Sequence, residues 1–154
     1  MGAEVQYVLI IWGKGFDEVD AITFASAMRQ SGMRTKIVGI DGANRTGNLG
    51  IALMPDMTLE QGIELLSLTV CIILPCHSRQ WHRLTQDPRY RMLMQTAAER
   101  NIYMVFREDG RTTACCDEIM RPNPSIVLSY HSDYVNEFAF DLADKLAGCS
   151  NIEN

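Results

Sequence analysis

Continuous apolar runs alternate with amphipathic stretches along this chain, and the alternation predicts strands that are each followed by a helix. A short run without a polar break indicates a strand buried on both faces, as in a parallel sheet. Strands are predicted over residues 5–11, 35–40, 68–74, 102–106 and 125–129, with 68–74 as the strongest apolar run, and a further short strand is predicted over 51–54.

Polar capping residues mark where the helices should begin. Asp17 precedes the first helix, and Asp87 followed by Pro88 predicts the start of another. Ser132 or Asp133 is expected to cap the last helix, which Gly148 should end. A short helix is also predicted over 58–66. The buried faces of the longer helices should carry Val19, Ile22, Ala25 and Met28 in the first, Tyr90, Leu93, Met94 and Ala97 in the one that starts at Pro88, and Val135, Phe138, Leu142 and Leu146 in the last.

The first strand, the first helix and the second strand form a βαβ unit, whose crossover should be right-handed. Repetition of this unit predicts an α/β fold of the flavodoxin-like type. We expect a three-layer sandwich with a mostly parallel sheet of about five to six strands and helices on both faces. The 154 residues contain no internal repeat or linker, so a single domain is expected over 1–154.

Charge and hydropathy narrow the possible partners. The formal net charge is -5, so the chain lacks the broad positive field that binds nucleic acid. No apolar run approaches the roughly 20 residues that span a bilayer, and residues 1–7 lack the basic start of a signal peptide. We therefore expect a cytoplasmic protein with no nucleic-acid partner and no membrane partner.

In open α/β sheets, ligands bind beyond the carboxyl ends of the strands, near the switch in strand order. This rule nominates residues 13–20, 75–81, 107–110 and 130–132, which follow four different strands and are expected to converge on one crevice. Within the first segment, Asp20 could reach a neighbouring strand end, or could simply favour the helix N-terminus.

Cysteine chemistry is one candidate for this crevice. Five cysteines at irregular spacing argue against a secreted disulfide framework and favour free thiols. Cys76 follows the strongest apolar run, where His77, His82 or His131 could activate its thiol. The competing interpretation is a small residue at a strand end.

Metal and nucleotide sites have weaker support. Gly13-Lys14-Gly15 resembles the start of a dinucleotide fingerprint, but Glu18 stands in place of the third glycine. No cysteine pair has the CxxC spacing of a zinc site. A zinc ion would need Cys76, His77 and His82 with Cys115 or Cys116. Cys115 and Cys116 could also be oxidisable thiols.

The order of these segments resembles the ThiJ/PfpI superfamily, the class I glutamine-amidotransferase-like group. Residues 8–20 are similar to the family's first strand, turn and acidic helix start, and residues 53–56 with Leu59 to its PD-x-x-L stretch. Residues 72–75 resemble the strand that ends in Pro-Gly-Gly, and residues 125–148 the closing strand and helix. The resemblance implies this fold, a homodimer and, in the family's enzymes, a cysteine nucleophile on a strained turn.

The chain departs from the family pattern where that chemistry would lie. Arg107 stands at the apparent cysteine position, and Asp20 replaces the glutamate that would partner the cysteine. Pro75-Cys76-His77 replaces the Pro-Gly-Gly turn. The resemblance therefore implies loss of the family's reaction, and Arg107 and Asp20 are predicted to form an ion pair across the former site.

These observations favour a protein without the family's cysteine-dependent hydrolase activity, which binds a small ligand or a protein partner and needs no cofactor or metal. The alternative is an enzyme or redox sensor with a relocated thiol at Cys76, acting on small carbonyl or amide compounds. Its candidate catalytic residues are Cys76, His77, Asp20 and His131. The ligand crevice is expected to be lined by Gly13, Asp20, Cys76, His77, Arg107 and His131.

Overall fold

Six parallel strands form the sheet, in the order β3-β2-β1-β4-β5-β6. The computed structural model describes residues 5–42, 45–108 and 126–152. The strands are β1 (Tyr7–Trp12), β2 (Arg34–Gly39), β3 (Met57–Thr58), β4 (Thr69–Leu74), β5 (Tyr103–Arg107) and β6 (Val127–Tyr130). The predicted α/β fold with a parallel sheet is therefore confirmed.

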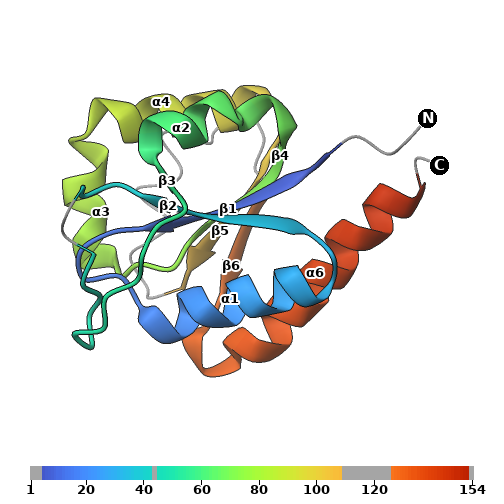
Figure 1. Cartoon of the computed structure of the whole chain (residues 1–154), viewed down its shortest axis with the longest axis horizontal. Coiled ribbons are helices and arrows are strands. Elements are labelled where there is room, and N and C mark those ends of the chain that lie inside the picture. The colour runs from blue at the N-terminus through green and yellow to red at the C-terminus, as the bar shows by residue number, and fades with distance from the viewer. Residues whose placement is uncertain (1–4, 43–44, 109–125, 153–154) are drawn as a thin grey trace.

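Helices cover both faces of this sheet (Figure 1). They are α1 (Glu18–Gln30), α2 (Leu59–Glu64), α3 (Ser78–Thr85), α4 (Pro88–Glu99) and α6 (Val135–Ile152), with short 3-10 turns over Leu66–Leu68 and Ser132–Tyr134. α1 packs beside α6 on one face, whereas α2, α3 and α4 lie on the other. Apart from the two-residue β3, the strand order is the flavodoxin-like one, so the three-layer prediction is also confirmed.

The core lies between the sheet and its two helix layers. The side chains of residues 8–11 in β1 and 71–74 in β4 are fully buried, because unbroken apolar runs suit strands that are covered on both faces. None of the helices in the described ranges is long and apolar enough to cross a membrane.

Two predicted helix starts are confirmed. Asp17 caps α1 by accepting a hydrogen bond from the Asp20 amide at 2.9 Å. Asp87 caps α4 by accepting from the Arg89 amide at 2.9 Å, with Pro88 at the first helical position, where its missing N–H costs nothing.

The end of the chain differs from the prediction. Ser132 and Asp133 lie within a 3-10 turn that precedes α6, and His131 caps this turn because its ring accepts a hydrogen bond from the Asp133 amide at 3.1 Å. α6 also continues past Gly148 to Ile152. A single glycine costs a helix only about 1 kcal/mol, which packing along α6 overrides.

Two further elements of the structure, β3 and α3, differ from the sequence prediction. No strand forms over 51–54, where Ala52 makes only an isolated bridge with Thr46, and the short strand is β3. α3 was not predicted, because most of its residues are polar and its apolar positions are few.

The buried face of α1 is also rotated relative to the prediction. Met28 is buried as expected, but Val19 and Ile22 are 55% and 50% exposed. Phe24 occupies the inward position and packs edge-on against the Tyr130 ring, with 4.9 Å between ring centroids. This contact fixes the helix rotation and turns Val19 and Ile22 outward.

Candidate functional site

Polar side chains converge where β1, β4, β5 and β6 end at their carboxyl termini. They come from the four segments that the sequence nominated, and hydrogen bonds join their side chains. We call this group the carboxyl-end cluster; it consists of Asp17, Asp20, His77, Arg107, Tyr130 and Ser132.

Arg107, the last residue of β5, connects the acids of this cluster. Its Nη1 donates to Asp17 Oδ2 at 3.1 Å, and its Nε lies 3.9 Å from Asp20 Oδ2. The predicted ion pair between Arg107 and Asp20 is confirmed, and Asp17 joins it. Because the Arg107 side chain is only 16% exposed, solvent screens these charges weakly.

His77 contacts the same guanidinium nitrogen that donates to Asp17. Arg107 Nη1 is 3.1 Å from His77 Nδ1 and 2.8 Å from His77 Nε2. A neutral imidazole has one acceptor nitrogen, so the guanidinium can donate to only one of them at a time. His77 stands at the N-cap position of α3 without using its side chain as a cap. Its ring therefore contacts Arg107 in the cluster and does not cap the helix.

Asp20 is a buried carboxylate with two hydroxyl donors. Tyr130 donates from its hydroxyl to Oδ2 at 2.8 Å, and Ser132 donates from Oγ to Oδ1 at 3.1 Å. Burial raises the pKa of Asp20 and the neighbouring Asp17 charge adds to the rise, while the Tyr130 hydrogen bond and the Arg107 charge oppose it. The net effect is a carboxyl group that takes up a proton more readily than an exposed aspartate does.

Tyr130 is held in place by aromatic packing. Its ring lies 4.9 Å from the Phe24 ring and 5.8 Å from the Phe138 ring, between centroids. Burial, followed by the charge of Asp20, raises the pKa of the Tyr130 phenol far above its usual range. The phenol therefore remains a neutral hydrogen-bond donor to Asp20.

The Cys76 thiol has no solvent-exposed surface. The Cys76 amide donates to the Leu74 carbonyl at 2.9 Å, which makes a tight turn at the end of β4. A substrate from solution cannot meet this thiol unless the surrounding residues move. This burial agrees with the interpretation of Cys76 as a small residue at a strand end.

Gly13 and His131, two of the expected crevice residues, make their contacts elsewhere. A Cβ at Gly13 would lie 2.7 Å from Asp41 Oδ2 and 2.7 Å from Ile40 Cγ1, so this glycine permits close packing against the end of β2. The His131 ring is half exposed and contacts Asp133, with its Nδ1 3.6 Å from Asp133 Oδ2. Both residues have structural explanations outside the carboxyl-end cluster.

Glu18 is a second buried carboxylate, which the sequence pattern did not single out as a structural residue. Its Oε2 accepts hydrogen bonds from the amides of Leu49 and Ile51 at 2.8 and 3.0 Å. Burial acts to raise the pKa of Glu18, but these backbone hydrogen bonds outweigh it and the pKa is lowered. Gly47 packs so closely on the Glu18 side chain that no Cβ would fit between them. Glu18 thus fixes the loop beside α1.

The geometry of the described residues does not support the zinc site or the nucleotide site considered in the sequence analysis. In the ranges that the structure describes, no three His, Cys, Asp or Glu side chains are grouped to hold a metal ion. Cys115 and Cys116 lie outside the described residues. The Lys14 amide donates to Asp41 Oδ2 at 2.6 Å and the Gly15 amide to the Thr46 carbonyl at 3.0 Å. Amides that would face a pyrophosphate are therefore bonded within the protein.

Solved structures that share this fold include several DJ-1 proteins. Drosophila melanogaster DJ-1beta matches with a TM-score of 0.76 at 15% sequence identity, over 93% of this chain and 91% of that chain. Oxidized Toxoplasma gondii DJ-1 matches with a TM-score of 0.72 at 12% identity, over 96% of each chain. Schizosaccharomyces pombe DJ-1 matches with 0.73 at 9% identity, over 96% and 97%. No protein-family model and no curated protein matches the sequence.

The fold is therefore that of the DJ-1/ThiJ/PfpI-like α/β proteins. The ThiJ/PfpI resemblance seen in the sequence is confirmed at the level of the fold. One fold supports many activities, so the function depends on the residues of the site rather than on the fold.

Proposed function

We propose that this protein is a DJ-1/ThiJ/PfpI-like binding domain that lacks cysteine-dependent hydrolysis and receives a small polar ligand at the carboxyl-end cluster. One observation carries the proposal. Where the resemblance expects a nucleophile, Arg107 presents a guanidinium that is 3.1 Å from Asp17 and 3.9 Å from Asp20. A guanidinium stays protonated and has no electron pair with which to attack a carbonyl carbon.

The cluster favours a ligand that carries a carboxylate or carbonyl oxygen. Tyr130 and Ser132 direct their hydroxyl groups at Asp20, which leaves Arg107 and His77 as the groups best suited to bind a ligand. Arginine recognises carboxylates through charge-assisted hydrogen bonds. A bound carboxylate would replace Asp17 as the partner of Nη1, while Asp17 would keep the hydrogen bond from the Asp20 amide.

Titration by NMR with acetate, glycolate and glyoxylate tests this proposal. We expect saturable amide shifts at residues 76–77, 107 and 130–132 for at least one of them. Arg107→Lys keeps a positive charge but removes the planar fork, and should weaken binding about tenfold. His131→Ala, outside the cluster, should bind like the wild type. Unsaturable shifts, or shifts unaffected by Arg107→Lys, would contradict the proposal.

A relocated thiol at Cys76 remains the alternative function, because His77 follows it directly and Arg107 lies against His77. Alkylation by iodoacetamide followed by mass spectrometry separates the two functions. The binding domain should leave Cys76 unmodified in the native state and modify it after denaturation, since the thiol is buried. Rapid native alkylation, together with consumption of glyoxal that is lost in Cys76→Ala, would establish the enzyme instead.

We also propose that two copies of the chain pair through the outer face of α1. Val19 and Ile22 are exposed there, and Glu18 on the same helix holds Leu49 and Ile51, whose side chains are exposed too. Large exposed apolar side chains favour association, and a homodimer is what the sequence resemblance implies.

A further inference from the structure

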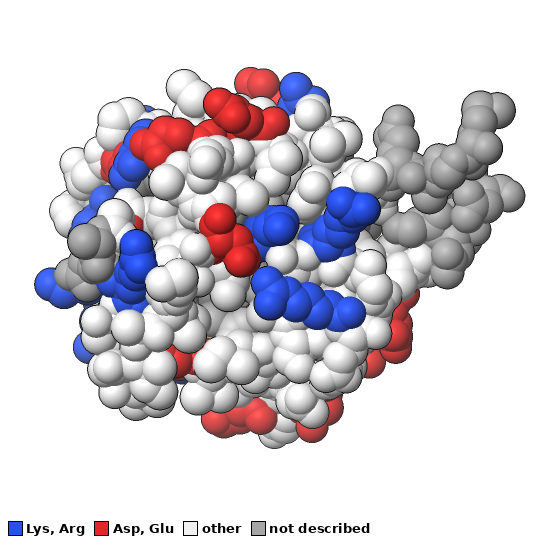
Figure 2. All heavy atoms as spheres, viewed as in Figure 1, with Lys and Arg blue, Asp and Glu red and all other residues white. Residues whose placement is uncertain are grey.

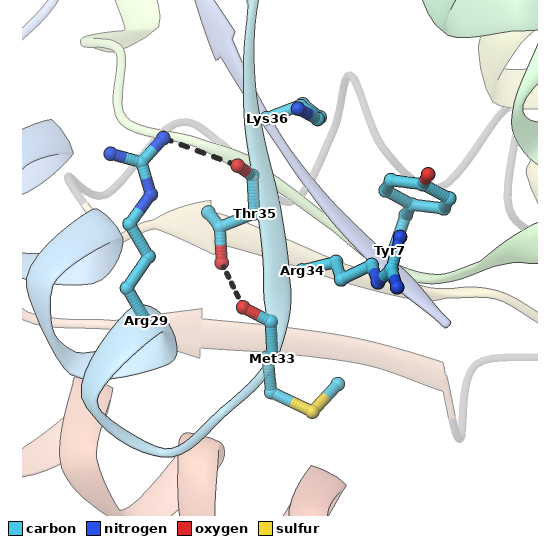
Figure 3. Close-up of a pocket in the computed structure, with 6 residues that line it drawn as sticks. All are labelled: Tyr7, Arg29, Met33, Arg34, Thr35 and Lys36. Carbon is cyan, nitrogen blue, oxygen red and sulfur yellow. Dashed lines mark hydrogen bonds between the residues drawn. The ribbon is translucent and has the colours of Figure 1, made fainter. Parts of the chain in front are cut away.

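A hollow with basic walls opens at the amino ends of β1 and β2 (Figure 3). Its volume is about 350 Å³, and it is lined by Tyr7, Arg29, Met33, Arg34, Thr35 and Lys36. Tyr7 and Arg34 are register partners at the first positions of their strands. Because the strands are parallel, this hollow lies at the opposite edge of the sheet from the carboxyl-end cluster.

Positive charge gathers around the hollow although the whole chain has a net charge of -5. Figure 2 shows Lys and Arg side chains grouped over β2 and the end of α1, with one acidic group beside them. Arg29 is paired with Asp56, its Nη2 being 3.3 Å from Asp56 Oδ2. Within the described part of the chain, Arg34 and Lys36 have no carboxylate at ion-pair distance.

The edge of β2 adds a backbone donor to these cations. Amide and carbonyl groups point to alternate sides along a strand, so Thr35 and Ile37 face the same edge. β3 pairs only with Val38 and Gly39, and the Ile37 amide donates to Asp56 Oδ2 at 2.8 Å. Neither β3 nor Asp56 accepts a hydrogen bond from the Thr35 amide. This amide lies at the same edge as the Ile37 amide, beside the basic side chains.

Asp56 shows how this edge holds an anion. Its Oδ2 accepts from the Ile37 amide at 2.8 Å and from Arg29 Nη2 at 3.3 Å, so one strand amide and one guanidinium share a carboxylate oxygen. Two residues earlier along β2, a strand amide and the Arg29 guanidinium again lie at the edge, but no carboxylate such as that of Asp56 is described there. The Thr35 amide replaces that of Ile37, Arg29 also donates to the Thr35 carbonyl at 3.2 Å, and Arg34 and Lys36 flank the position.

From this geometry we propose a second binding site, for a small molecule that carries a phosphate monoester, in the hollow between Tyr7 and Arg29. A tetrahedral phosphate presents three acceptor oxygens in different directions, which suits donors that come from both sides of a strand edge. Figure 3 shows Arg29 on one side of β2, and Arg34, Lys36 and Tyr7 on the other. Tyr7 and Met33 contribute apolar surface to the lining of the hollow for the organic part of the ligand.

Titration of the ¹⁵N-labelled protein with phenyl phosphate at low salt tests this site, because salt screens charge pairs. We expect saturable binding with the largest shift at the Thr35 amide. The double variant Arg34→Gln/Lys36→Gln should bind at least tenfold more weakly. Arg91→Gln/Arg100→Gln, which removes two exposed cations of the other helix layer, should bind like the wild type.

Three results would overturn the proposal. The first is the absence of saturable binding. The second is equal weakening in the two double variants, which would indicate a general charge effect rather than a site. The third is benzoate that shifts the Thr35 amide with an affinity equal to that of phenyl phosphate, which would reject the phosphate assignment for this site. Because Arg107 and His77 take no part in this site, Arg107→Lys should leave phenyl phosphate binding unchanged, so this site and the carboxyl-end cluster can fail independently.

Discussion

The hydroxyl group of Tyr130 donates a 2.8 Å hydrogen bond to the carboxylate of Asp20, across 110 residues of sequence. The bond ties the end of β6, an edge strand, to the first turn of α1. We expect Tyr130→Phe to lower the free energy of unfolding by about 1–3 kcal/mol, because it leaves a buried carboxylate without its shortest donor. Urea unfolding measures this, and Tyr134→Phe, which changes an exposed tyrosine, is the matched control. Equal effects of the two variants would refute the role given to this bond.

The charge state of Asp20 gives the protein a pH-dependent stability. Because folding raises the pKa of Asp20, its contribution to stability is fully present below the unfolded pKa of about 3.9 and is lost as pH rises through the folded value. Asp20→Asn removes this titration. Relative to the wild type, the variant should therefore become more stable as pH rises from about 3 to about 7. Urea unfolding across that range measures the difference, and Asp144→Asn on the exposed side of α6 is the matched control.

Removal of the Arg107 guanidinium should be costly, since it leaves Asp17 and Asp20 beside each other without their cation. We expect Arg107→Met to lower the free energy of unfolding by about 3–5 kcal/mol. The double variant Arg107→Met/Asp20→Asn should lose less than the sum of the single variants, because the unpaired charge is also gone. A double-mutant cycle in urea measures the coupling, and strict additivity would show that the two side chains do not interact energetically.

Glu18 should respond to pH in the opposite sense to Asp20. Its pKa is lowered in the fold, so its contribution to stability is present above the unfolded pKa of about 4.3 and is lost as pH falls through the folded value. Glu18→Gln should lose about 1–3 kcal/mol at neutral pH, and this loss should shrink below about pH 4. Glu64→Gln, on an exposed position of α2, serves as the control. A loss that does not change with pH would rule out a charge-dependent role for Glu18.

The proposed pairing of two chains through α1 predicts a change of mass in solution. Light scattering should give twice the mass of one chain for the wild type and the mass of one chain for Ile22→Glu, because a buried unpaired charge opposes association. Met92→Glu alters a similarly exposed side chain on α4 and should remain dimeric. A wild type that is monomeric at high concentration would end this proposal.

The sequence predicted the sheet and the meeting of its strand ends for a clear physical reason. Unbroken apolar runs identify buried strands, and a parallel sheet brings their carboxyl ends together, so Asp20, His77 and Arg107 could be grouped before the structure. The hydrogen bond from Tyr130 to Asp20 could not be predicted, because it depends on the rotation of α1 and on the position of β6 within the sheet.

Other features depend on contacts that no local pattern records. Glu18 is buried while its neighbour Val19 is exposed, the reverse of what their polarity predicts. The cause is the loop over residues 47–51, whose amides need an acceptor at that position. The basic hollow was missed for a similar reason, because Arg29 lies in a helix whereas Arg34 and Lys36 belong to a strand, and only the fold brings them together.

The carboxylate of Asp17 divides its two oxygens between separate tasks. Oδ1 accepts from the Asp20 amide at the start of α1, and Oδ2 accepts from Arg107 at 3.1 Å. A ligand that draws the guanidinium away would break only the second contact, so the first turn of the helix would keep its cap. The contact between Asp17 and Arg107 can therefore change while the cap of α1 stays in place. A ligand carboxylate can replace Asp17 as the partner of Arg107 without unwinding the first turn of the helix.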